Sequence, residues 1–190
     1  MGDYCTVDRL RSYAGIEAIV DDTLLERAIE GAESFINQET RREFFIASDS
    51  WRSYHAVDAV DGDTLFLDHD LAAVSTILNG NGEEIEVGDY ALLPSNATPS
   101  YGIQLKWDVW TYSSSPIEAI RVKGYWGFSK TAPADIVQAT THLAAYLYKQ
   151  KDSQVFETAG FVDGGVLVIP KGVPVGVLLT IGNYRRQGLA

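Results

Sequence analysis

The clearest hydrophobic pattern in the chain lies between residues 21 and 36. Asp21 and Asp22 open it, and carboxylates are favourable beside the free N–H groups of a first helical turn. Apolar residues then recur three or four positions apart, which predicts a helix with one buried face. That face consists of Leu24, Leu25, Ala28, Ile29, Ala32, Phe35 and Ile36. The charged residues expected mostly away from it are Glu26, Arg27, Glu30 and Glu33.

Two further helices are expected on either side of the middle of the chain. Thr6 can cap a short helix that Gly15 ends. Pro133 opens another, because a proline has no N–H to leave unpaired in a first turn. The buried stripe of this second helix is expected to consist of Ile136, Thr140, Leu143 and Leu147.

A last helix is expected over residues 175–186. Arg185 and Arg186 would then lie at its C-terminal end, where the helix dipole favours cations. The residues expected to face inward are Val177, Leu178 and Ile181.

Between residues 46 and 128 the pattern changes to short apolar runs that turn residues separate. Asp61-Gly62 is a hairpin-type turn, and a second turn is expected from Asn79 to Gly82. Strands are expected at 51–57, 64–67, 74–78, near 85, and at 90–93, 103–107 and 117–125. Strands this short and closely spaced predict a small β-sandwich or barrel-like lobe.

The simplest architecture for these elements is of the α+β class. Residues 1–45 and 129–190, the two ends of the chain, are expected to form a small helical bundle. Residues 46–128 are expected to form an antiparallel β lobe inserted between its second and third helices.

Composition supports a folded chain of ordinary type. Of its 190 residues, 46% are hydrophobic, which is enough for a real core. No apolar run approaches the roughly 20 residues that span a bilayer, and the N-terminus lacks the pattern of a secretory signal. Cys5 is the single cysteine, so we expect no internal disulfide and a reducing compartment.

The net charge of −11 is unevenly distributed. Residues 1–100 hold 20 acidic against 6 basic residues, a net of −14, whereas residues 101–190 hold 6 against 9, a net of +3. High-affinity binding of nucleic acid needs clustered lysine and arginine, and the acidic half would repel a phosphate backbone. Such a surface remains compatible with DNA that passes nearby without being held.

A cluster of acids in the β lobe invites a metal interpretation. It consists of Asp58, Asp61, Asp63, Asp68 and Asp70, with His55 and His69. With Gly62 as the invariant glycine of a calcium loop, Val57 and Ala59 would occupy the first and third ligand positions, so the pattern fails. Asp68-His69-Asp70 is more simply a turn. We therefore expect no metal site and no cofactor.

No residue pattern favours catalysis. Cys5 lacks a nucleophile signature, and the chain has no nucleophile elbow, phosphate loop or paired metal-ligand motif. The aromatic residues of the β lobe could line a sugar-binding cleft, although packing in a core or interface explains them better. They are Trp107, Trp110, Tyr112, Trp126 and Phe128.

The segment 154–173 is longer than most connections inside a compact domain. Glycines give it backbone freedom, and the run Val166 to Ile169 is prone to form a strand that needs a partner. A local hairpin and strand pairing with a neighbouring subunit both remain open.

Taken in order, several segments of the chain resemble the head–tail connector (adaptor, or head-completion) proteins of tailed bacteriophages. They are Tyr4 to Leu10 with Gly15-Ile16, Asp22 to Ile29, Thr40 to Phe44, Gly124 to Gly127, and the whole of 133–186. The shorter members of this family are almost purely helical, so the β lobe departs from the minimal pattern.

The resemblance implies a structural, non-enzymatic virion protein that is made in the host cytoplasm and joins the phage neck. Such proteins form a homo-oligomeric ring, usually twelvefold, below the portal protein. The ring extends the channel through which double-stranded DNA passes without specific binding, and it offers a platform to the next neck or tail-completion protein. It implies no cofactor and no membrane.

The C-terminal segment of this family commonly contacts the portal, which implies a portal or subunit interface here. The candidate residues are Val166, Val168, Lys171, Val177, Ile181, Tyr184, Arg185 and Arg186. Two other functions stay open on the sequence. One is a tail-completion or other neck protein, and the other is a carbohydrate-binding or hydrolytic virion accessory domain built on the β lobe.

Overall fold

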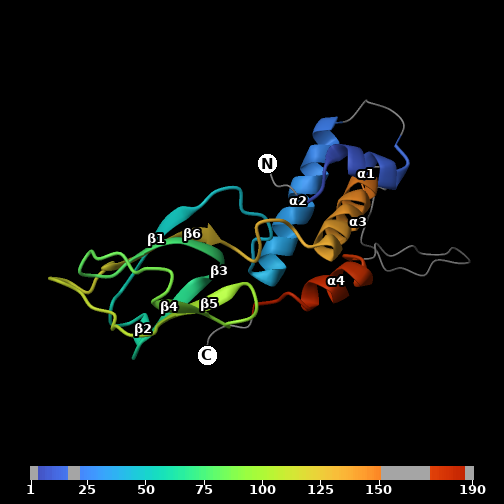
Figure 1. Cartoon of the computed structure of the whole chain (residues 1–190). Coiled ribbons are helices and arrows are strands. Elements are labelled where there is room, and N and C mark those ends of the chain that lie inside the picture. The colour runs from blue at the N-terminus through green and yellow to red at the C-terminus, as the bar shows by residue number, and fades with distance from the viewer. Residues whose placement is uncertain (1–3, 17–21, 151–171, 187–190) are drawn as a thin grey trace, which may run out of the picture. The chain divides into compact units, whose positions relative to one another are not determined.

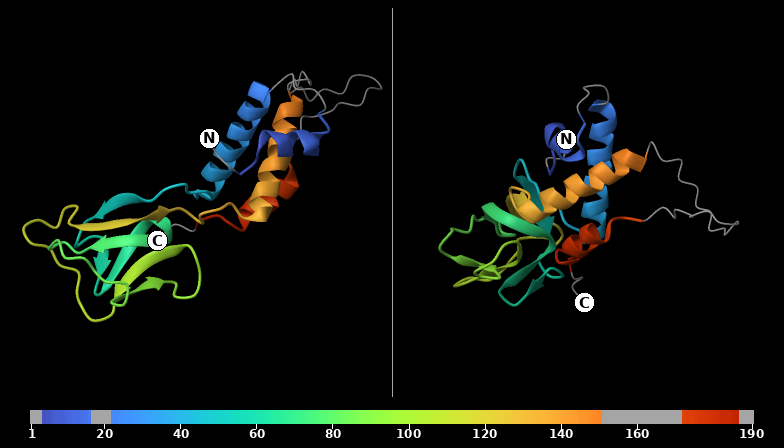
Figure 2. Two further views of the ribbon diagram at one scale, coloured as in Figure 1. Left: turned by 45° about the horizontal axis from the view of Figure 1, so that its top comes forward. Right: turned by 90° about the vertical axis from the view of Figure 1, so that its right-hand side faces the viewer.

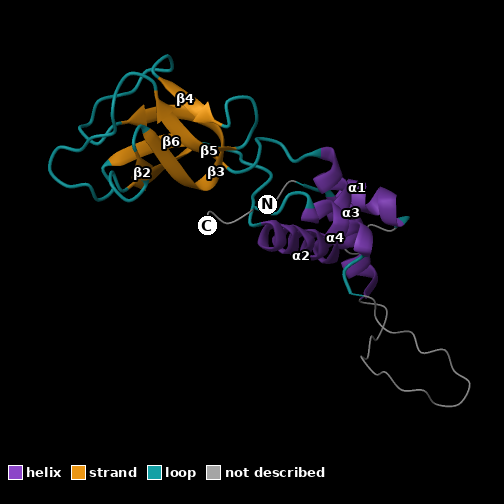
Figure 3. Ribbon diagram, turned by 90° about the horizontal axis from the view of Figure 1, so that it is seen from below, coloured by secondary structure: helices purple, strands orange, loops and turns teal. Residues whose placement is uncertain are grey.

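A computed structural model describes residues 4–16, 22–150 and 172–186, and it divides the chain into two compact units (Figure 1). The described residues of Met1–Arg41 and Ala132–Ala190 form a helical unit, and Arg42–Thr131 form a β unit. Helices and strands separate completely between the two (Figure 3). The predicted α+β class, with a β part inserted into a helical part, is confirmed.

The helical unit begins with α1 (Val7–Ala14) and α2 (Asp22–Thr40). The Thr6 hydroxyl accepts the N–H of Arg9 at 3.2 Å, and Gly15 ends α1 with a left-handed φ of 67°. Both caps agree with the sequence-based expectation, because capping depends on residues close in sequence.

The predicted face of α2 is buried at five of its seven positions, with Leu24 exposed and Phe35 half-buried. Glu33, expected outside, is buried instead. Its carboxylate accepts the Tyr4 N–H at 3.0 Å, so a backbone donor compensates part of the cost of burying this side chain. The buried apolar residues are Leu25, Ala28, Ile29, Ala32 and Ile36.

The second half of the helical unit comprises α3 (Ala134–Gln150) and α4 (Val175–Gly182). As Figure 2 illustrates, α3 packs against α1, α2 and α4. Ile136, Thr140 and Leu143 are buried as predicted, whereas Leu147 is half-buried. The helix α4 ends at Gly182 instead of extending to Arg186. After it, the N–H groups of Asn183 and Tyr184 donate to carbonyls three residues back, which forms a tighter turn than an α-helix.

The β unit is one antiparallel sheet with the strand order β1-β6-β3-β5-β4, and β2 pairs with β3 beside this path. Several predicted strand ends shift by a few residues, and the strand expected near Ile85 is only an isolated bridge between Leu78 and Glu84. The strands are β1 (Ser50–Tyr54), β2 (Val60–Asp61), β3 (Thr64–Leu78), β4 (Tyr90–Leu93), β5 (Ser100–Leu105) and β6 (Ile120–Trp126).

The long strand β3 organises the unit. Its first half pairs with β5 and its second half with β6, and register shifts mark the change of partner around Leu71. The sequence predicted two strands here with a turn at Asp68-His69-Asp70, which is wrong. These residues form a bulged part of one strand, where Asp68 and His69 both face outward and Asp70 is buried.

Because β3 bends, its two ends lie at the same end of the β unit. That end also holds the C-termini of β1 and β5 and the N-termini of β4 and β6, as the pairs Tyr54–Ile120 and Tyr90–Leu105 require. We call it the loop end. Its three loops are residues 55–63, which include the short strand β2, and residues 79–89 and 106–118. Leu71 pairs with both Ser100 and Trp126 at the opposite end.

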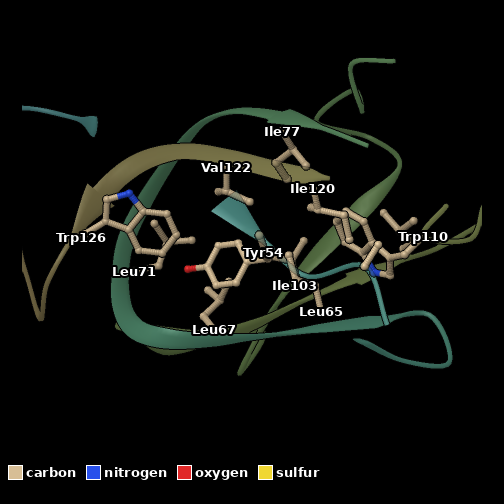
Figure 4. Close-up of a cluster of buried hydrophobic side chains, with 12 residues drawn as sticks. Tyr54, Leu65, Leu67, Leu71, Ile77, Ile103, Trp110, Ile120, Val122 and Trp126 are labelled. Carbon is tan, nitrogen blue, oxygen red and sulfur yellow. The ribbon is translucent and has the colours of Figure 1, made fainter. Parts of the chain in front are cut away.

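The core of the β unit fills the inside of this bend. Figure 4 shows Trp126 and Leu71 at one end of the core and Trp110 at the other. The indole N–H of Trp110 donates to the Asp63 carbonyl at 2.8 Å, which fixes the 106–118 loop across the loop end. The other core residues are Tyr54, Ala56, Leu65, Leu67, Ile77, Ile103, Leu105, Ile120 and Val122.

Two glycines in the segment 124–127 are required by close approaches inside the β unit. A Cβ on Gly124 would lie 2.6 Å from the Ala73 carbonyl oxygen of β3. A Cβ on Gly127 would lie 2.8 Å from the Glu43 carbonyl oxygen, beside the place where the Phe128 N–H donates to that same oxygen at 2.7 Å. Only a residue without a side chain fits either position.

Candidate functional site

The helix α4 carries apolar residues on both of its faces. Val177 and Ile181, one turn apart, are almost fully buried inside the helical unit. Leu178, expected inward, instead shares the opposite face with Val175 and Leu179, and these three are 42%, 70% and 70% exposed. The unpartnered apolar face of α4 is therefore Val175, Leu178 and Leu179.

Residues 184–186, which follow α4, contact two other helices. The Tyr184 hydroxyl donates to both carboxylate oxygens of Asp135 on α3, at 2.9 and 2.8 Å. Burial, and then the hydrogen bond and the charge of Asp135, raise the pKa of Tyr184 to about 12, since each of them favours the neutral phenol.

Arg185 and Arg186 lie at the C-terminal end of α2, whereas the sequence placed them at the end of the last helix. The Arg185 guanidinium pairs with the Glu39 carboxylate, and its Nε donates to the Glu39 carbonyl at 3.2 Å. The Arg186 N–H donates to the Thr40 carbonyl at 2.9 Å. These contacts satisfy carbonyl groups that the helix leaves open, and the cation also suits the negative dipole end.

Five of the eight predicted interface residues are thus placed within their own helical unit, by burial or by these contacts. Val166, Val168 and Lys171 lie outside the described residues, as does most of the 154–173 segment. The exposed face of α4 contains Val175 and Leu179, which the sequence reasoning missed. A usable signal was present, because five of the eight α4 residues are large and apolar and a helix of this length cannot bury them on a single face.

Asp63, Asp68 and Asp70, three of the acids considered as metal ligands, have partners within the fold. The Arg42 guanidinium binds the buried Asp70 carboxylate at 2.6 Å, and the Tyr54 hydroxyl donates to Asp68 at 3.0 Å. The hydrogen bond from Gln104 lowers the pKa of Asp63, because it favours the carboxylate. Across the described part of the chain, no three His, Cys, Asp or Glu side chains come together as metal ligands.

The aromatic residues considered for a sugar-binding cleft do not converge. Trp110 and Trp126 are buried in the core of the β unit, and Phe128 packs against Phe44 with ring centroids 5.3 Å apart. Trp107 and Tyr112 lie exposed on loops. This arrangement offers no aromatic cleft for a carbohydrate.

Cys5 is buried in the helical unit. The Thr141 hydroxyl donates to its sulfur at 3.3 Å, and burial raises the pKa of the thiol above its usual value. A buried thiol that is harder to ionise is a poor nucleophile, which fits a packing role. None of the described helices is long and apolar enough to cross a membrane.

Solved assemblies contain chains of the same fold. In the neck of the empty GTA particle, computed with C6 symmetry, the similar chain is 19% identical with a TM-score of 0.59, over 97% of this chain and 90% of that one. Chains in the neck of the native GTA particle, computed with C12 symmetry, and in the virion of the native gene transfer agent (GTA) particle match at 18% identity and a TM-score of 0.58, with the same coverage.

No protein-family model matches the chain, and no curated protein matches it. The similarity to solved structures covers both the helical and the β unit, so the β unit belongs to the shared fold and is not an addition peculiar to this chain. The expected resemblance to connector proteins is confirmed at the level of the fold.

Proposed function

We propose that this chain is a structural protein in the neck of a tailed, phage-like particle, where it forms a ring below the portal and joins head to tail. The observation that carries this proposal is the fold match over 97% of the chain to a chain in a particle neck. Necks computed with C12 and C6 symmetry favour a ring of many identical copies, and twelve is the number we propose.

The proposed portal contact is the apolar face of α4, Val175, Leu178 and Leu179. An interface centre is formed by apolar side chains that lose contact with water on docking, and these three are available for that role. Val177 and Ile181 support this face from inside the helical unit. Tyr184, Arg185 and Arg186 are held by contacts to α2 and α3, and their remaining surface can meet the portal at the edge of the contact.

The ring is proposed to extend the DNA channel without binding DNA. The 20 acidic residues among positions 1–100, against 6 basic ones, make the first half of the chain repel a phosphate backbone. A wall of this charge lets DNA move through instead of holding it. The role is mechanical and needs no catalytic group.

The decisive experiment deletes the gene in the genome that encodes the chain and compares the particles by electron microscopy and mass spectrometry. We expect the wild-type chain in purified tailed particles, and the deletion to leave DNA-filled heads without tails. A complementing copy should restore the tails. Normal tailed particles from the deletion, or particles that lack the wild-type chain, would refute the proposal.

Surface variants test the portal contact better than truncation does. Removing residues 174–186 would also remove the buried Val177 and Ile181 and the contacts at the end of α2, so lost attachment could reflect unfolding. Substitution of Val175 and Leu179 alone avoids this ambiguity.

A further inference from the structure

The loop end of the β unit exposes a second group of apolar side chains. They lie on all three of its loops, and they are Val57, Val87, Trp107, Val109, Tyr112 and Ile117. Val87 is 80% exposed. Trp107 is 84% exposed, which is unusual for so large an apolar side chain. None of these side chains belongs to the buried core of the β unit.

Backbone contacts between the loops hold these residues in one region. The Ala56 N–H donates to the Pro116 carbonyl at 2.8 Å, which brings the loops of Val57 and Ile117 together. The Lys106 N–H donates to the Asp89 carbonyl at 2.8 Å, and its ammonium donates to the Gly88 carbonyl at 2.9 Å, so the segments of Trp107 and Val87 are neighbours.

The Asn79 side chain fixes the third part of this region. Its amide nitrogen donates to the Val109 carbonyl at 3.1 Å, and its amide oxygen accepts the Thr111 N–H at 3.0 Å. Asn79 is itself buried. The loop that carries Val109 and Tyr112 is thereby tied to the end of β3, so the exposed apolar residues are presented by an ordered framework.

The loops that carry this apolar group are also rich in carboxylates. The three loops contain nine acidic residues against one lysine, a net of −8 out of −11 for the whole chain. Eight of the nine are exposed: Asp58, Asp61, Glu83, Glu84, Glu86, Asp89, Asp108 and Glu118. Within the described residues, no ion pair joins any of the eight to a lysine or arginine.

We infer that the loop end is a docking surface for another protein of the particle, one that presents apolar side chains ringed by lysine and arginine. Protein interfaces commonly combine apolar contacts with a polar or charged rim, and tryptophan is one of the residue types that most often dominate binding. The inference rests on the proposed function, which supplies the particle, and names the surface and the chemistry of a partner there.

The charge decides between the possible occupants. DNA and anionic lipid would be repelled by a surface with a net of −8. A second copy of the chain that used the same surface would bring two such charges together, and a copy that used another face would still carry a net charge of −11 and match less well than a cationic partner. A cationic protein surface remains, and it would pair the carboxylates while it covers the apolar residues.

Photocrosslinking inside assembled particles tests the inference. The crosslinking amino acid p-benzoylphenylalanine is placed at position 107, where the exposed side chain carries no core contact. Position 101 is the matched control, because Tyr101 is an exposed aromatic residue of the same unit next to Ser100, away from the loop end. We expect position 107, and not 101, to crosslink to a different particle protein at a segment rich in lysine and arginine.

Charge reversal provides the second arm. Glu84→Lys with Glu86→Lys should lower the crosslinking yield at position 107 about tenfold, whereas Glu26→Lys with Glu30→Lys on the exposed side of α2 changes the net charge equally and should leave it unaltered. Thermal unfolding of all variants should match the wild type, because every substituted residue is exposed.

The outcomes separate this inference from the proposed function. Particles that contain the chain but show no crosslink at position 107, or a crosslink to DNA, to another copy, or to a segment without excess lysine and arginine, overturn the docking surface alone. Equal effects of the two charge reversals also overturn it. Absence of the chain from purified particles overturns both.

Discussion

Gly124 offers a test of the packing between β3 and β6 in which two physical effects predict opposite signs. Alanine in place of a strand glycine usually stabilises a protein by about 0.5–1 kcal/mol, because the unfolded chain loses conformational freedom. At Gly124 the new methyl group would lie 2.6 Å from the Ala73 carbonyl oxygen and 2.6 Å from Cδ1 of Leu71. Both distances are far shorter than van der Waals contact, and one of them is to backbone.

The steric effect should win. Overpacking of a tight interior costs about 1–3 kcal/mol. Subtracting the unfolded-state gain leaves about 0–2.5 kcal/mol. Because one of the two contacts is to backbone, which cannot move aside as a flexible side chain can, we expect Gly124→Ala to destabilise the β unit by about 1–2 kcal/mol. For a unit of this size that corresponds to a fall in melting temperature of roughly 4–16 °C.

Urea unfolding followed by tryptophan fluorescence isolates the relevant unit, because all 4 tryptophans lie between residues 51 and 126. Gly88→Ala is the matched control. A Cβ there meets nothing within 4 Å and the backbone is not left-handed, so stability should change by less than about 0.5 kcal/mol. If Gly124→Ala proved as stable as the wild type, the close approach of β3 to β6 would be refuted.

Three further predictions concern the helical unit. Ile36→Ala should lower the free energy of unfolding by about 2–5 kcal/mol, measured by helical circular dichroism, because Ile36 is fully buried. Leu24 is exposed, so Leu24→Ala should lower it by less than about 0.5 kcal/mol. Equal losses would contradict the orientation of α2. The pKa of Tyr184 is raised to about 12 in the folded chain, against about 10 in the unfolded chain. Its contribution to folding stability is therefore complete below about pH 10 and is lost as the pH rises toward 12. Tyr184→Phe should abolish this part of the loss of stability at alkaline pH. An unchanged alkaline profile in Tyr184→Phe would contradict it. Val175→Ser with Leu179→Ser should preserve the melting temperature and abolish attachment of the chain to heads; normal attachment would exclude this face as the portal contact.

The sequence was most informative where a structure depends on neighbouring residues. The caps at Thr6 and Gly15 and the buried stripe of α2 follow from rules that act within one or two helical turns. Glu33 marks the limit of that reasoning. Its burial depends on the N–H of Tyr4, which lies 29 positions away in the sequence, and no local pattern reports such a partner.

The prediction of a turn within β3 was wrong for the same reason. Asp68-His69-Asp70 is polar enough to be taken for a turn, yet the strand continues because distant residues bind its acids. Tyr54 donates to Asp68, and Arg42 pairs with Asp70. A local preference for turns is thus overridden by partners that only the folded sheet provides.

The residues that form an exposed surface were the hardest to predict. A sequence shows how many apolar residues an element has, but not which of them another element covers. On α4 the residues at positions 177 and 181 meet the helical unit, whereas those at 175 and 179 do not. The contacts that decide this come from α2 and α3, far away in the sequence. Candidate interface residues chosen from the sequence therefore included two that their own subunit buries.

The joint placement of apolar and acidic residues at the loop end explains how such a chain can remain dissolved before assembly. Trp107 and Val87 would favour self-association if they were surrounded by neutral residues, and the net charge of −8 on the three loops opposes it by repulsion between copies. The same charges attract a cationic partner.

Salt should therefore have opposite effects on self-association and on binding of the partner. At 1 M it reduces the screening length to about 3 Å, which weakens both the repulsion between copies and the attraction of the partner. High salt should promote self-association of the purified chain, measured by sedimentation, and weaken its crosslinking to the partner. Trp107→Ser should suppress the self-association, and a salt-independent monomer in both proteins would remove this explanation of the acidic loops.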